Sequence, residues 1–244
     1  MAKQPIKIKP YTPLKLPLKE IKFSFSLLKK AKKAIAQHNL LISQLSSKEK
    51  EKRIIKESKQ TLDGHNPIFT KEAIDFLCDH LPKKIDQKLA CKIHGIIQQD
   101  SLEKGKIRKR QNWIGEEGSS IEKAWFLPPK ASLLASFLKN LFLYAEKKEE
   151  EPLIQIALFF AQFLLLHPFM NGNGRVARLL ATTLFFQKKI TTEISLFLGH
   201  YFKKHRLEYN RRLFAISEEN DWENWIHFFL KAIIAESFRK DSAK

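Results

Sequence analysis

The twelve residues from His167 to Arg178 read HPFMNGNGRVAR, and they separate two long stretches of helical character. An apolar run over residues 153–166 ends directly before them. Proline, glycine and asparagine then disfavour continuation of a helix, and helical spacing resumes at Val176. The stretch therefore predicts a helix, a glycine-rich loop and a second helix.

The predicted loop is suited to binding an anion. Backbone N–H groups of such a loop and of the following first helical turn converge, and the helix dipole favours negative charge there. Arg175 and Arg178 are three apart, so they are expected to share a helix face and reach bound phosphates. His167 at the rim could accept a proton near neutral pH, and Phe169 should anchor the loop in the core. The alternative is an ordinary turn between two helices with a chance pair of arginines.

Apolar residues spaced three and four apart predict helices along most of the chain. His38 falls on the apolar stripe of the first of them and is expected to be packed. Four prolines within residues 1–20 predict an extended strap. The expected helices cover about 24–45, 47–62, 70–81, 88–97, 131–147, 152–166, 176–188, 203–217 and 222–238.

Residues 103–130 differ from the rest of the chain. Trp113-Ile114 and Trp125-Phe126 are short aromatic-rich runs on either side of a Gly/Ser loop, which predicts a β-hairpin. The expected fold class is therefore mostly α with one hairpin.

The twelve-residue stretch resembles the defining pattern of the Fic domain, H-x-F-x-[D/E]-G-N-G-R-x-x-R. Seven of its eight fixed positions match, and the likeness extends over about residues 88–238. Gly174 stands where the related Doc kinases place a lysine. The resemblance implies a Fic-type helical core at 88–240, with the hairpin as its flap and residues 1–87 as an N-terminal helical layer that could regulate it. The matching positions are His167, Phe169, Gly172, Asn173, Gly174, Arg175 and Arg178.

A Fic domain implies a protein adenylyltransferase, which moves AMP from ATP to a Ser, Thr or Tyr hydroxyl of a target protein. By this resemblance His167 would take the proton of the attacking hydroxyl, and Asn210 would contribute to the adenine pocket. Gly172, Asn173 and Gly174 would cradle the phosphates, while Arg175 and Arg178 would hold the β- and γ-phosphates. The flap residues Trp113, Ile114, Trp125 and Phe126 would pin an extended target segment.

Asn171 departs from the pattern, because an Asp or Glu that holds Mg²⁺ is expected there. Magnesium prefers hard oxygen ligands and usually a carboxylate, so Asn171 should weaken the metal site. Three hypotheses follow. The metal could bind mainly through ATP in a slower AMP transferase, which we favour. The enzyme could use another donor, or it could be catalytically weak and act by binding.

Many Fic proteins carry an inhibitory helix with the pattern [S/T]-x-x-x-E-[G/N]. The segment from Lys59 to Gly64 occupies the corresponding place, with Asp63 as its acid, one methylene shorter than Glu, and Lys59 where Ser or Thr is expected. Asp63 could pair with Arg178 as a leaky brake. An ordinary helix end with a turn at Asp63 and Gly64 is equally compatible with the sequence.

The net charge of +18 is concentrated in residues 1–110, with 26 Lys and Arg against 11 Asp and Glu. Solvated helix faces explain such a bias, but a basic half could also meet nucleic acid or an acidic partner. The rival functions are a Fic-fold enzyme with an altered donor or de-AMPylation activity, and a basic binding module with a degenerate loop. Two cysteines, no bilayer-spanning apolar run and no signal peptide predict a cytoplasmic protein, or one delivered to a host cell without a cleaved signal.

Overall fold

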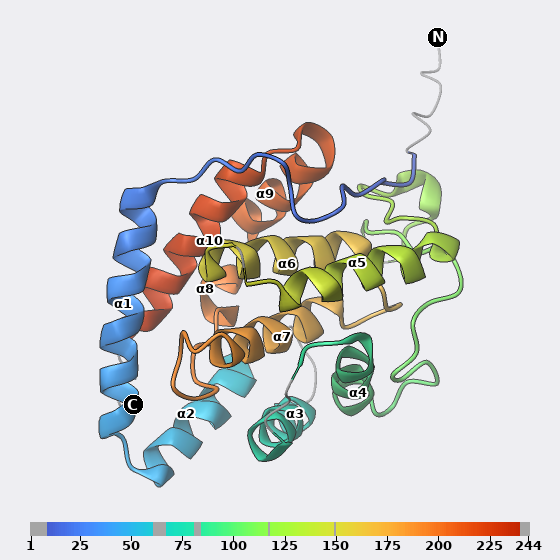
Figure 1. Ribbon diagram of the computed structural model, residues 1–244. Helices are drawn as coiled ribbons and strands as arrows, with labels where there is room; N and C mark the ends of the chain where they lie inside the picture. Colours follow the sequence, from blue (N-terminus) through green and yellow to red (C-terminus); the bar gives the residue numbers. More distant parts are fainter. Residues whose placement is uncertain (1–8, 61–66, 81–83, 117, 149, 240–244) are drawn as a thin grey trace.

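The computed structural model describes residues 9–60, 67–80, 84–116, 118–148 and 150–239, and it is mostly helical (Figure 1). Helix α6 (Pro152–Leu166) lies at the centre, and all but its first residue are buried. A helix that is apolar on every side needs neighbours all round. These are α5 (Leu134–Glu146), α7 (Asn173–Gln187), α9 (Arg206–Glu219) and α10 (Trp222–Ser237).

The N-terminal helices cover this core from the outside. Helix α1 (Phe25–Gln44) runs along α10, and α2 (Ser47–Gln60) contacts α3 (Pro67–His80) and α8 (Gly199–Lys204). Helix α4 (Gln87–Ile97) packs between α3 and α7. Buried residues of α1, α3 and α4 belong to the same hydrophobic cluster as α6 and α10. The division into 1–87 and 88–240 stays a prediction.

The predicted strap is extended where the structure describes it, and it lies across α5 and α6 (Figure 1). The Asn140 amide bonds both main-chain groups of Leu16, its Oδ1 accepting at 2.9 Å and its Nδ2 donating at 2.8 Å. Gln162 of α6 donates to the Leu14 carbonyl at 2.9 Å. These amides supply the backbone partners that a strap outside a sheet otherwise lacks.

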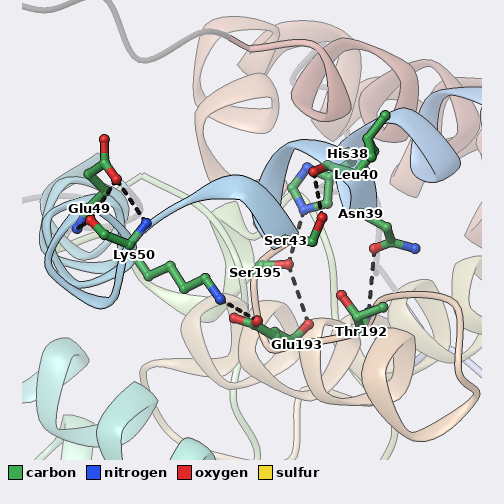
Figure 2. Close-up of polar contacts among 10 residues, drawn as sticks. His38, Asn39, Leu40, Ser43, Glu49, Lys50, Thr192, Glu193 and Ser195 are labelled. Atoms are coloured by element: carbon green, nitrogen blue, oxygen red, sulfur yellow. Dashed lines mark hydrogen bonds and ion pairs between the residues drawn. The ribbon is translucent and has the colours of Figure 1, made fainter.

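The turn between α1 and α2 is fastened to the segment that leads into α8 (Figure 2). His38, buried as predicted, lies with its Nε2 3.0 Å from the Ser195 hydroxyl, and Lys50 pairs with Glu193 at 2.6 Å. Ser46 and Glu49 form a reciprocal cap at the start of α2, with the Ser46 N–H donating to Glu49 at 2.8 Å. The N-terminal layer therefore supports the chain just before α8.

The predicted β-hairpin is wrong. In the described part of the chain, the flap has a single antiparallel bridge between Ile114 and Phe126 and no strand. The chain between them turns through a short 3-10 helix, Ile121–Lys123, and the Trp113 indole donates to the Ser119 carbonyl across the turn. Just before the bridge, the Asn112 side-chain amide donates to the Met170 carbonyl of the glycine-rich loop.

Helix boundaries differ from the sequence expectations in three places. Helix α3 begins at Pro67, where proline suits a first helical position, and Thr70 is buried inside it. Helix α7 begins at Asn173 and so includes part of the glycine-rich stretch. The single helix expected at 203–217 is two helices, α8 and α9, joined at His205. Among the described residues, no helix is both long and apolar enough to span a bilayer.

Candidate active site

The stretch from His167 to Arg178 forms the predicted helix, loop and helix. His167 directly follows the last residue of α6 as its C-cap, and it adopts a left-handed conformation with φ 48° and ψ 59°. Gly172 is the N-cap residue of α7 and has a φ of 71°, a left-handed conformation that glycine adopts readily because it lacks a Cβ. Two left-handed residues five positions apart reverse the chain, so α6 and α7 lie side by side (Figure 1).

Asn173 and Phe169 hold the loop rigid. The Asn173 Oδ1 accepts from the Phe169 N–H at 2.9 Å, and its Nδ2 donates to the Phe169 carbonyl at 2.8 Å. Phe169 is fully buried, as predicted, and it stacks on His94 with 3.9 Å between ring centroids and 6° between planes. The Asn173 side chain is thus engaged with the loop, and its contribution to an anion would come from its backbone.

His94 of α4 joins two segments around this loop. Its Nδ1 lies 2.8 Å from the Gly105 N–H, which can only donate, so Nδ1 accepts. Its Nε2 therefore carries the proton and donates to the Asn171 carbonyl at 3.2 Å. Burial, with a further contribution from the Arg175 charge, lowers the pKa of His94 to about 4, and the bond to Asn171 opposes this. The ring is neutral at physiological pH.

The segment after Gly105 is bonded to the same loop by two buried side chains. Arg108 donates from its side-chain Nε to the His167 carbonyl at 2.8 Å. Its backbone N–H donates to the Pro168 carbonyl at 2.9 Å. Asn112 donates to the Met170 carbonyl at 2.9 Å. The flap and the loop are therefore one continuous hydrogen-bonded unit.

His167 is half-buried and lines a pocket together with residues of the flap and of α6 to α9. Its Nδ1 lies 3.3 Å from the Leu164 carbonyl, which can only accept, so this nitrogen carries the proton and Nε2 is left as the acceptor. Burial lowers the pKa of His167 to about 4; the Leu164 bond opposes this and the Arg108 charge adds to it. A neutral imidazole with a free Nε2 can act as a general base at pH 7.

The pocket has a volume of about 330 Å³, and both apolar and cationic side chains line it. It brings together seven residues singled out from the sequence: His167, Gly174, Arg178, Asn210, Ile114, Trp125 and Phe126. The described lining contains no Asp or Glu. The remaining lining residues are Gly115, Leu164, Leu165, Gly199, Phe202, Lys203, Arg206, Tyr209, Leu213 and Phe214.

Other predicted site residues lie elsewhere. Arg175, expected to share the phosphate face with Arg178, is buried and donates to the Ile97 carbonyl of α4 at 3.1 Å. Trp113 is outside the pocket lining, with its indole bonded within the flap turn. Gly172 also lies outside the lining, beside Gln98. Asp63 lies outside the described residues.

The residues around Asn171 do not build a carboxylate-held magnesium site. The Asn171 side chain is exposed, and its carbonyl oxygen already accepts from His94. No group of three or more His, Cys, Asp or Glu side chains that could hold a metal occurs among the described residues. A metal at this position would have to take most of its ligands from a bound molecule and not from described acidic side chains.

Sequence reasoning missed four residues of the site: His94, Arg108, Lys203 and Arg206. None stands in the glycine-rich stretch. His94 and Arg108 reach it from 77 and 59 residues away. Spacing along one helix gives no signal for contacts between segments this far apart in the sequence, and Arg108 stands among other basic residues, so its burial has no local signal.

Comparison with known proteins agrees with this geometry. The Fic/DOC family model matches residues 84–185. Protein adenylyltransferases Fic of Drosophila mojavensis and Drosophila willistoni are 26% and 27% identical over 136 residues, which is 51% of this chain and 25% of each relative. The chain thus covers only a minor part of these relatives.

Solved structures show the same fold. A Fic family protein from Desulfovibrio desulfuricans superposes with a TM-score of 0.72 at 19% identity, over 89% of this chain and 74% of that one. A Fic domain containing signaling protein from Bacteroides thetaiotaomicron gives 0.64 at 15% identity, over 85% and 95%. The Fic/DOC family model thus matches residues 84–185 of this chain, and the chain shares its fold with solved structures of Fic family proteins.

Proposed function

We propose that the protein transfers AMP from ATP to a hydroxyl group of a protein target. The observation that carries the proposal is the placement of His167 with an acceptor Nε2 in one pocket with Gly174 and Arg178. The curated relatives are named protein adenylyltransferases, which supports transferase activity of this kind.

His167 would act first as the proton acceptor. The target Ser, Thr or Tyr hydroxyl gives its proton to Nε2 as its oxygen attacks the α-phosphorus. The bond from that phosphorus to the β-phosphate oxygen breaks, and pyrophosphate leaves with both electrons of the bond. The products are the AMP-modified target and pyrophosphate, with the proton on the imidazole until solvent removes it.

Negative charge that develops on the leaving pyrophosphate would be balanced by the cationic wall. Arg178 lies one turn into α7, and Lys203 and Arg206 face the same pocket from α8 and α9. Guanidinium groups hold phosphates by paired hydrogen bonds, and ammonium groups act as point charges. Fixed cations aimed at developing charge are an effective form of catalysis.

The apolar lining of the pocket suits a purine base. Phe202, Leu213 and Phe214 supply apolar and aromatic surface, and Asn210 is the amide among them. An amide can both donate to and accept from a base edge. We assign this part to the adenine, with Asn210 as its polar contact.

The flap is proposed as the docking site for the target segment. Trp125 is exposed and lines the pocket together with Ile114 and Phe126 of the bridge. An extended peptide could pair with the flap there, as in strand addition.

The deciding experiment compares two positions of the label on ATP. The full chain is incubated with a protein lysate and ATP labelled at either the α- or the γ-phosphate. AMP transfer leaves the α-label alone on protein, with a mass gain of about 329 Da, the mass of one nucleotide group. Protein that retains the γ-label, or free nucleotide products without modified protein, would contradict the proposal. Arg110→Gln, an exposed change away from the pocket, is the matched control for His167→Ala.

We further propose that Asp63 restrains this activity by pairing with Arg178. The support is positional: Asp63 belongs to the connection between α2 and α3, and Ile74 of α3 shares a small cavity with Arg175 and Arg178. Asp63→Ala should then increase labelling of the chain itself. Unchanged labelling with Asp63→Ala, at a protein level equal to wild type, would reject the brake.

A further inference from the structure

Arg108 carries a buried charge that is bonded to main-chain carbonyl groups. Its side chain is 2% exposed, yet its guanidinium contacts main-chain carbonyl oxygens and no carboxylate among the described residues. Burying a charge costs several kcal/mol unless excellent hydrogen bonds compensate it. Burial lowers the pKa of Arg108 to about 10, which leaves it charged at pH 7.

The guanidinium bonds link three segments at one point. Nε donates to the His167 carbonyl at 2.8 Å, and Nη2 lies 3.4 Å from the Leu166 carbonyl at the end of α6. Nη2 also donates to Pro129 at the flap exit at 2.6 Å, and Nη1 to Arg110 at the flap entry at 3.0 Å. The C-terminal end of α6 carries partial negative charge, so a cation is favoured there.

His167 needs such a support. A residue other than glycine in a left-handed conformation carries strain of about 1–3 kcal/mol, and the surrounding structure must hold it there. The Arg108 bond is made to the carbonyl of that very residue. The bond therefore fixes the main chain on the C-terminal side of His167.

We propose that Arg108 is the positioning residue of the site: its bond to the His167 carbonyl holds His167 in its left-handed turn. The proposal rests on the proposed function only in taking His167 as the proton acceptor. Arg108 contacts neither donor nor target and acts through His167. By bonding both ends of the flap, it also ties the target-docking edge to the base.

Other cations face His167 from neighbouring elements. Arg178 of α7, Lys203 of α8 and Arg206 of α9 line the same pocket, and all of them disfavour a charged imidazole. Leu164 opposes them by accepting from Nδ1. The test must therefore isolate Arg108 from these groups.

The experiment is an NMR titration of the His167 ring in the full chain, with His167→Ala to assign the signal. Wild type should show the Nδ1–H tautomer and a midpoint well below the ordinary value. Arg108→Gln should raise the midpoint and mix the tautomers, because a nearby like charge and a carbonyl anchor are lost. Arg108→Lys should retain the low midpoint but mix the tautomers, and lower kcat about 10²-fold through misplacement of the base. Arg110→Gln, whose side chain instead faces outward to Glu103 at 3.0 Å, should match wild type in all respects.

These readouts separate the two proposals. If no nucleotide is transferred by wild type, the proposed function fails, but the titration still decides the role of Arg108. If Arg108→Gln does not fold, Arg108→Lys and the wild-type tautomer decide. A wild-type ring in the Nε2–H tautomer, or Arg108 variants whose ring titrates and is oriented as in wild type, would overturn the inference.

Discussion

Lowering the pH from 7.5 to 5.5 should remove about 3 kcal/mol of folding stability through His38 and His94, in addition to the loss through His167, whose pKa is lowered to about 4 as well. His38 is fully buried between α1 and the segment before α8, and His94 lies between α4 and the glycine-rich loop. Burial is the main reason that the pKa of each falls to about 4. Nearby Arg53 adds to the effect at His38.

The magnitude follows from the difference between folded and unfolded states. In the unfolded chain each histidine has an ordinary pKa of about 6.5, so at pH 5.5 about nine-tenths of it is protonated. In the folded chain about 3% is protonated at that pH, given a pKa near 4. The unfolded state thus binds more protons, and each histidine lowers the free energy of unfolding by about 1.4 kcal/mol. Because the folded pKa is depressed, this stability is present above about pH 6.5 and is lost as the pH falls toward 4.

Urea unfolding at both pH values measures the effect. His94→Gln replaces the ring with an amide that can still accept from Gly105 and donate to Asn171, but does not titrate. The loss of unfolding free energy between pH 7.5 and 5.5 should shrink by about 1.4 kcal/mol in this variant. Equal losses in wild type and His94→Gln would refute the reasoning, whatever the absolute stabilities are.

Further predictions concern the pocket and its loop. His167→Ala should lower the rate of AMP transfer about 10²–10⁴-fold with ATP binding retained, as seen by calorimetry and labelling; equal losses of rate and binding would contradict a base role. Asn171→Asp should raise the rate in Mg²⁺ but not in EDTA, because it adds a charged oxygen ligand; labelling at graded Mg²⁺ tests this. Phe169→Ala should cost about 3–5 kcal/mol in urea unfolding. The double variant Lys203→Ala, Arg206→Ala should raise KM for ATP several-fold, because two cations that are proposed to hold the phosphates are removed. An unchanged KM would place the phosphates elsewhere.

The predictable part of this site is the part that its local sequence determines. Glycine, asparagine and proline force the break between α6 and α7 wherever the rest of the chain lies, and Phe169 is buried because its side chain is large and apolar. The flap was misjudged because its aromatic runs have β propensity, while the turn between them is closed by a 3-10 helix and a Trp113 bond. Tertiary contacts decided that outcome.

The same distinction explains why the two arginines of α7 have different surroundings. Residues three apart on an α-helix differ by about 60° in direction, which is close enough to share a face in an isolated helix. In the folded chain α4 packs against one edge of that face and the pocket opens at the other. Arg175 therefore bonds to the end of α4, while Arg178 lines the pocket. Loss of Arg175 should consequently weaken the contact between α4 and α7, and with it the His94 support of the loop, whereas loss of Arg178 should act on the nucleotide directly.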